Sequence, residues 1–166
     1  MTEQQKHNGQ IQWLVKAVDM AFQKNQGLWA DSLLDALEGL AAEQADWKPD
    51  EEGARSIWEI VDHVTFWKDA VIQRLERKPW PDASQDKDWL SVTEIGEAAW
   101  AKTVDQLKSV HEKLIQGVSQ LQDEVLDQPF PDEERPIGEH LFGLVAHDSY
   151  HTGQILTLRQ LQGIGL

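Results

Sequence analysis

The sequence predicts an all-α fold, a four-helix bundle, because its apolar residues follow a helical period and short polar, proline-bearing segments separate the periodic stretches. Within each stretch apolar side chains recur three or four residues apart, which places them on one face of a helix. We find no stretch with the two-residue alternation that is typical of a strand. Three long helices and one broken N-terminal helical segment would together form the bundle.

The N-terminal half is expected to hold two helical segments and the start of a long helix. Residues 11–23 carry apolar side chains at helical spacing, and after a short polar break a leucine stripe runs through residues 28–45. A loop then leads to Ser56, which is followed three residues later by Glu59. This pair is the signature of a capping box, so we expect a helix over residues 57–77.

The C-terminal half is expected to hold two further long helices. Two prolines end the preceding helix, and a polar connector reaches residue 88. An imperfect apolar stripe that includes Ile95 predicts a helix over residues 91–125. Residues 129–136, rich in proline and acidic residues, form a loop, and the final helix is expected over residues 137–162.

Composition excludes several classes of protein. With no internal repeat and no dividing linker, the chain is expected to form one domain, residues 1–166. Its 15 basic and 29 acidic residues give a net charge of −14, which argues against nucleic-acid and membrane partners. The absence of cysteine excludes disulfides and thiolate chemistry. The N-terminus lacks the apolar core of a signal peptide, so we expect a cytoplasmic protein. Most of the eight tryptophans are expected to pack in the core.

The most informative motif is the HDSYH segment near the C-terminus. His147 and His151 are four residues apart, so on a helix they lie one turn apart on the same face. Both imidazoles can therefore reach one metal ion. With a third ligand from elsewhere, the site would keep open coordination positions, as catalytic metal sites do. For the pair alone, coincidence is an equally good explanation.

His63 is the best candidate for the third ligand. Its neighbours on the helical wheel, Ile60 and Trp67 among them, place it on the apolar face of its helix. A buried, hydrogen-bonded neutral histidine is the alternative for His63 taken alone. Of the other histidines, His7 lies in the polar N-terminal tail, and His111 is expected to be solvated. Three histidines on the core faces of bundle helices favour a metal site.

These residues also carry a family resemblance. The segments SIWEIVDHVTFWKDAV (residues 56–71) and HDSYHTGQI (residues 147–155) resemble the DinB-like (DinB/YfiT-like) family of metal-dependent enzymes. The resemblance extends from about residue 10 to residue 163. It implies a four-helix bundle with up-down-down-up connectivity and one divalent metal ion. The implied ligands are His63, His147 and His151. His140 lies outside this pattern, two turns before His147, and is treated as a pocket residue.

The ligand set and the resemblance together suggest a reaction class. Three neutral imidazoles leave the ion its double positive charge, which acidifies a bound water or thiol. Nickel, zinc and iron(II) all suit such a site. The resemblance implies a thiol (bacillithiol-type) S-transferase or a hydrolase that acts on a small molecule. The absence of cysteine is compatible with a transferase whose sulfur comes from a thiol cosubstrate.

Three further residues are candidates for supporting catalytic roles. Gln154 lies one turn beyond His151 and would hold a bound water or substrate group. Glu59 lies one turn before His63 and would orient its ring or act as a base, although the capping role at the helix start competes. Tyr150, the single tyrosine, would donate to an anionic intermediate, with packing at an interface as the alternative.

Two alternatives to a small-molecule enzyme can be weighed on the sequence. A zinc protease would need Glu where the motif has Asp148, and a strand to hold its peptide, so this interpretation is disfavoured. A non-catalytic, dimeric metal-binding or ligand-sensing module is the stronger alternative. It rests on a final helix that is apolar nearly all round, with Phe142 and Leu156 away from the histidines, which also predicts a homodimer. A DNA-binding role is opposed by the net charge.

Overall fold

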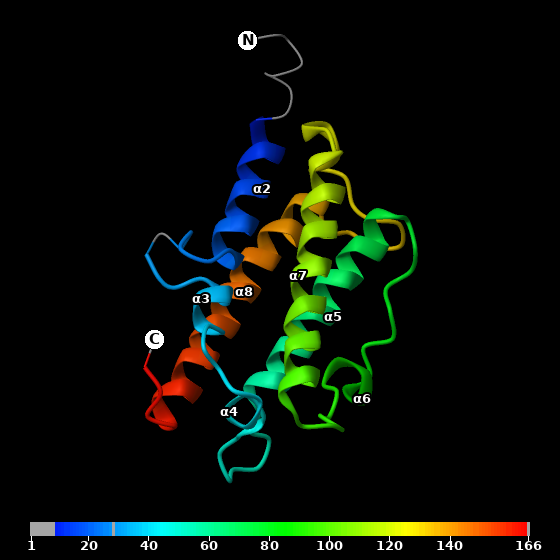
Figure 1. Cartoon of the computed structure of the whole chain (residues 1–166). Helices are drawn as coiled ribbons and strands as arrows, with labels where there is room; N and C mark the ends of the chain where they lie inside the picture. The colour runs from blue at the N-terminus through cyan, green and yellow to red at the C-terminus, as the bar shows by residue number, and fades with distance from the viewer. Residues whose placement is uncertain (1–8, 28, 166) are drawn as a thin grey trace.

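The computed structural model describes residues 9–27 and 29–165, and their regular structure is helical apart from an isolated bridge between Pro129 and Pro136 (Figure 1). The long helices are α2 (Gly9–Phe22), α5 (Ile57–Leu75), α7 (Glu97–Ser119) and α8 (Ile137–Leu161). The short ones are α3 (Leu33–Ala36), α4 (Ala42–Asp46), α6 (Gln85–Asp88) and the 3₁₀ turn η1 (Asp123–Val125). The predicted all-α class is confirmed, whereas the up-down-down-up connectivity stays a prediction. None of the described helices is both long and apolar enough to cross a bilayer.

The long helices pack around a core that is divided along their length. Helix α5 contacts both α7 and α8, and α2 closes the arrangement against α8 and α7. One apolar cluster joins the first half of α5 to α3, α4 and the end of α8, and the other joins α2 to the start of α8. Between the two clusters lie buried polar side chains: Lys68, His111, Asp148 and His151. We refer to these four residues as the polar layer.

The stretch at residues 28–45 is not the single helical segment that the leucine stripe suggested. It forms α3 and α4, and Gly39 between them has a φ of 70°, in the left-handed region that favours glycine. Helix α3 has its own capping box at Ser32, so the backbone starts a new helix there. Leu33, Leu37 and Leu40 are still buried, and α3 packs on α8. Leu28 lies outside the described residues.

The helix predicted over residues 91–125 is shorter at both ends. It spans Glu97–Ser119, and Gly96 precedes it at the N-cap position. Ile95 therefore does not face the core and is 56% exposed. The helices expected over residues 11–23, 57–77 and 137–162 are confirmed to within about two residues, the usual uncertainty of a helix end.

The tryptophans do not mainly fill the core. Trp58 and Trp100 are buried and pack against each other. Trp13 and Trp29, by contrast, are 59% and 97% exposed. The expectation of mostly buried tryptophans was therefore wrong, because helical spacing alone does not show which face of a helix another element covers.

Candidate metal centre

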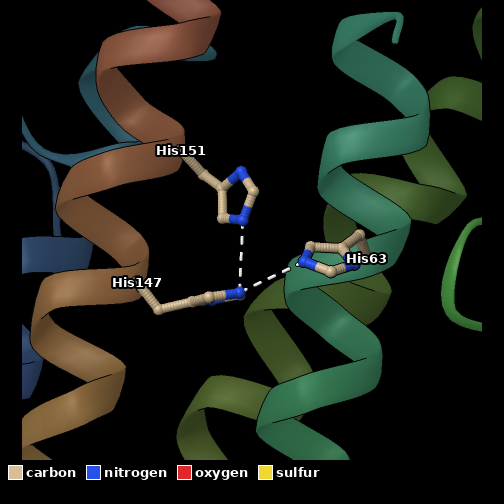
Figure 2. Close-up of side chains that lie close together, drawn as sticks. All are labelled: His63, His147 and His151. Atoms are coloured by element: carbon tan, nitrogen blue, oxygen red, sulfur yellow. Dashed lines mark hydrogen bonds between the residues drawn. The ribbon is translucent and has the colours of Figure 1, made fainter. Parts of the chain in front are cut away.

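Three histidines from two helices converge in the middle of the bundle. His63 comes from α5, and His147 and His151 come from successive turns of α8, which faces it (Figure 2). The Nε2 atom of His147 lies 3.2 Å from the Nε2 atom of His63 and 3.2 Å from that of His151. The ligand atoms of all three lie within 4.8 Å of one another, so the group can hold a metal ion. The helical-wheel placement of these residues was therefore correct.

Hydrogen bonding alone does not account for this convergence. The Nδ1 atoms of His63 and His151 face the oxygens of Asp88 and Gln154, so in the neutral rings both Nε2 atoms carry lone pairs. The Nε2 atom of His147 can donate to one of them at most. One cation among the three nitrogens would satisfy all of them. Nitrogens at zinc-bond length around a tetrahedral ion lie about 3.3 Å apart.

Asp88 orients His63, a role that was not predicted from the sequence. Its Oδ1 atom lies 2.8 Å from Nδ1 of His63, and the indole Nε1–H of Trp67 donates to the same oxygen at 2.7 Å. Such a carboxylate–histidine pair fixes the ring and leaves Nε2 to a metal. Asp88 lies at the end of α6, in the segment expected to be a plain connector, so the helical spacing around His63 gave no signal for it.

On α8 the corresponding partner is Gln154, with Tyr150 behind it. Nδ1 of His151 donates to Oε1 of Gln154 at 2.7 Å, and Nε2 of Gln154 donates to the hydroxyl of Tyr150 at 3.1 Å. Gln154 therefore orients the His151 ring, whereas the sequence suggested that it holds a water or substrate. Tyr150 is 63% exposed, so its hydroxyl is open to solvent beside the site.

Glu59 serves the helix start and not the His63 ring. Its Oε2 atom accepts the backbone N–H of Ser56 at 2.8 Å, and its N–H donates to the Ser56 hydroxyl at 3.1 Å. The other carboxylate oxygen faces Lys48 and Arg55 at 3.5 and 3.6 Å. Of the two roles left open by the sequence, the structure shows the cap, which satisfies a buried backbone donor.

The electrostatics keep the three imidazoles neutral. Burial, together with the neighbouring His151 and His63, lowers the pKa of His147 to about 3. Burial also lowers the pKa of His151 to about 4, and it lowers the pKa of His63 although Asp88 opposes this shift. Because only the neutral ring can bind a metal, all three are in the ligand form near pH 7.

Comparison with known families adds a further observation. The sequence matches the family model of the DinB superfamily over residues 28–155, well over half of the chain. The chain belongs to the DinB superfamily. The matched part of this DinB-superfamily protein includes all three histidines of the triad. Comparisons with curated proteins and with solved structures found no match.

Two other histidines of this DinB-superfamily protein lie apart from the triad. The prediction of a solvated His111 is wrong, since this side chain is fully buried, stacks on Phe22 at 3.7 Å and lies 3.1 Å from Asp19. His140 lies with its Nε2 atom against Oε1 of Glu133 and lines a cavity together with His147, as expected of a pocket residue. His7 lies outside the described residues.

Asp148, the second residue of the HDSYH motif, has a structural partner. Its Oδ2 atom accepts a hydrogen bond from Nζ of Lys68 at 2.6 Å, and both side chains are fully buried. Lys68 Nζ also lies 3.4 Å from Nδ1 of His111, which connects the polar layer across the bundle. The carboxylate thus joins α8 to α5 and does not act as the base of a protease. Lys68 was not predicted from the sequence, because an isolated lysine adds nothing to a hydrophobic pattern.

Proposed function

We propose that this protein is a metal-dependent enzyme in which His63, His147 and His151 hold one divalent ion. It acts on a small molecule, as a thiol (bacillithiol-type) S-transferase or as a hydrolase. The observation that carries the proposal is the convergence of three Nε2 atoms, two of which present lone pairs to the third. Membership of the DinB superfamily supports it. Three protein ligands leave coordination positions open for water or substrate.

The chain's own residues would prepare this site in two ways. Asp88 and Gln154 fix the rings of His63 and His151, so that their Nε2 atoms face the ion without rearrangement. A bound nickel, zinc or iron(II) ion would supply a Lewis acid that acidifies a water or a thiol. We propose that Tyr150, held by Gln154, donates a hydrogen bond to the developing negative charge on the substrate.

The metal content of the purified protein tests the proposal. Elemental analysis without metal supplementation should give about one divalent ion per chain in the wild type. His63→Ala and His147→Ala should lose it. His140→Ala is a matched control, because His140 is also partly buried and lies against the carboxylate of Glu133 but is outside the triad. Metal that stays in His63→Ala would refute the triad.

Turnover separates an enzyme from the alternative, a non-catalytic dimeric module. The alternative is favoured by exposed aromatic side chains on α2 and α8, where Trp13 is 59% and Phe142 is 54% exposed. We propose a homodimer through this face in either case. Thiol cosubstrates offered with electrophiles, and ester or amide substrates offered alone, should give product only with metal present. A metal-loaded protein that turns over none of these would favour the module.

A further inference from the structure

A large cavity adjoins the triad on one side. Its volume is about 1010 Å³, enough for an organic molecule of ordinary metabolite size. His147 belongs both to the triad and to the cavity wall. His63 and His151 are buried, whereas His147 is half-buried, so the triad is exposed through His147, its one member that lines the cavity. The Nδ1 atom of His147 is buried and has no hydrogen-bond partner among the described residues.

The inner wall of the cavity is aromatic and apolar. Trp67 and Trp80 supply two indole rings, and Val71 and Leu144 supply aliphatic surface. Gly143 keeps the space beside α8 open, since a Cβ atom added there would meet no atom within 4 Å. A larger side chain at this position would therefore extend into the cavity without displacing the backbone.

The outer wall is acidic. Glu133, Glu134 and Glu139 line it, against the single guanidinium of Arg135. Glu133 accepts a hydrogen bond from the indole of Trp80 at 3.0 Å, and Arg135 lies 3.9 Å from Glu139 with both side chains about two-thirds exposed. The three carboxylates outnumber the one guanidinium. The entrance therefore carries net negative charge, in a chain whose total is −14.

We propose that this cavity binds the organic substrate and selects compounds with an apolar or aromatic body and a protonated amine. Indole faces attract a cation as well as an apolar ring, and one face of Trp80 already holds the guanidinium of Arg74, 5.3 Å from the ring centroid. The carboxylates attract the amine and repel carboxylate compounds. The link to catalysis rests on the proposed function. Binding to the cavity does not, because none of the residues that define its charge belongs to the triad.

Two isosteric probes test the class of ligand, 2-phenylethylamine and 3-phenylpropionate. Binding is followed by the indole N–H signals of Trp67 and Trp80 in ¹⁵N spectra of the full chain, with and without added zinc. The amine should shift both signals saturably, with a Kd about fivefold or more below that of the carboxylate. High salt should reduce this ratio of the two Kd values, because it screens the charges. Equal or tighter binding of the carboxylate, or no shift with either probe, would overturn the proposal.

Two pairs of variants locate the binding site. Gly143→Leu should abolish amine binding, whereas Gly153→Leu, the same substitution on the same helix in a different cavity, should preserve it. Glu134→Gln should weaken amine binding about twofold or more. Glu112→Gln, on the exposed surface of α7, should not. If Gly143→Leu keeps its helical content and still binds the amine as the wild type does, the cavity is not the binding site. If Gly143→Leu fails to fold, wild-type amine affinity in Glu134→Gln would refute the proposal.

Failure of the cavity proposal and failure of the proposed metal-dependent function give different results. Amine binding that needs the open space at Gly143, in a protein that takes up no metal, would support the cavity and refute the proposed function. If the protein binds metal but its Trp67 and Trp80 signals respond to neither probe, the cavity proposal is refuted and the metal site is supported.

Discussion

Removal of the Lys68 ammonium group should destabilise the protein far more than removal of a surface lysine with the same ion-pair distance. Lys68 lies 2.6 Å from Asp148, and both side chains are 0% exposed. In Lys68→Met the Asp148 carboxylate stays buried, and its Oδ1 atom has no hydrogen-bond partner among the described residues to compensate. Breaking a buried pair from one side costs about 3–5 kcal/mol. For a chain of this length that lowers the Tm by roughly 6–20 °C.

The matched control is Lys78→Met. Lys78 also lies 2.6 Å from its partner, Glu76, but the two side chains are 59% and 54% exposed, so the loss of stability should be small. Urea denaturation followed by circular dichroism gives both free energies of unfolding. The double variant Lys68→Met/Asp148→Leu should recover most of the loss, because no buried charge is left without a partner. A Lys68→Met cost no greater than that of Lys78→Met would refute this reasoning.

Three further predictions concern pH and assembly. The metal-free protein should lose stability as the pH falls from about 6.5 to about 4. Burial lowers the pKa of His151 and His111 to about 4 and that of His147 to about 3, so in this pH range the unfolded chain binds more protons than the folded one. Urea titrations at several pH values measure the free energy of unfolding. Burial raises the pKa of Asp62 to about 6, so its ionised form destabilises the fold above that pH. By the same urea titrations, Asp62→Asn should raise the free energy of unfolding by about 1 kcal/mol at pH 8, after a reduction for solvent screening, and by little at pH 4. Light scattering should find a dimer in the wild type and a monomer in Phe142→Glu; a monomeric wild type would refute the homodimer.

The helices and the triad were predictable because both depend on local periodicity. The capping box at Ser56 and Glu59 fixed the start of α5, and hence the face on which His63 lies. Helical spacing was sufficient to place His147 and His151 together. The break between α3 and α4 was missed, since it depends on the backbone at Gly39, which has no side chain to contribute to a hydrophobic pattern.

The partners of the triad were not predictable in the same way. Asp88 reaches His63 from a connector, and Lys68 reaches Asp148 from another helix, so each contact exists only through tertiary packing. His111 illustrates the same limit. Its sequence neighbours are polar, yet Phe22 from α2 covers its ring and Asp19 satisfies its Nε2 atom.

The polar layer and the triad depend on each other through helix geometry. Lys68 follows His63 on α5, and Asp148 directly follows His147 on α8, so the same two helices are joined at two points on different faces. A rotation of α8 that moved His147 away from His63 would also separate Asp148 from Lys68. The apolar clusters on either side have no such directional preference, because dispersion and burial tolerate small rotations. We therefore expect the buried ion pair, costly as it is to desolvate, to hold the three Nε2 atoms at metal-binding spacing.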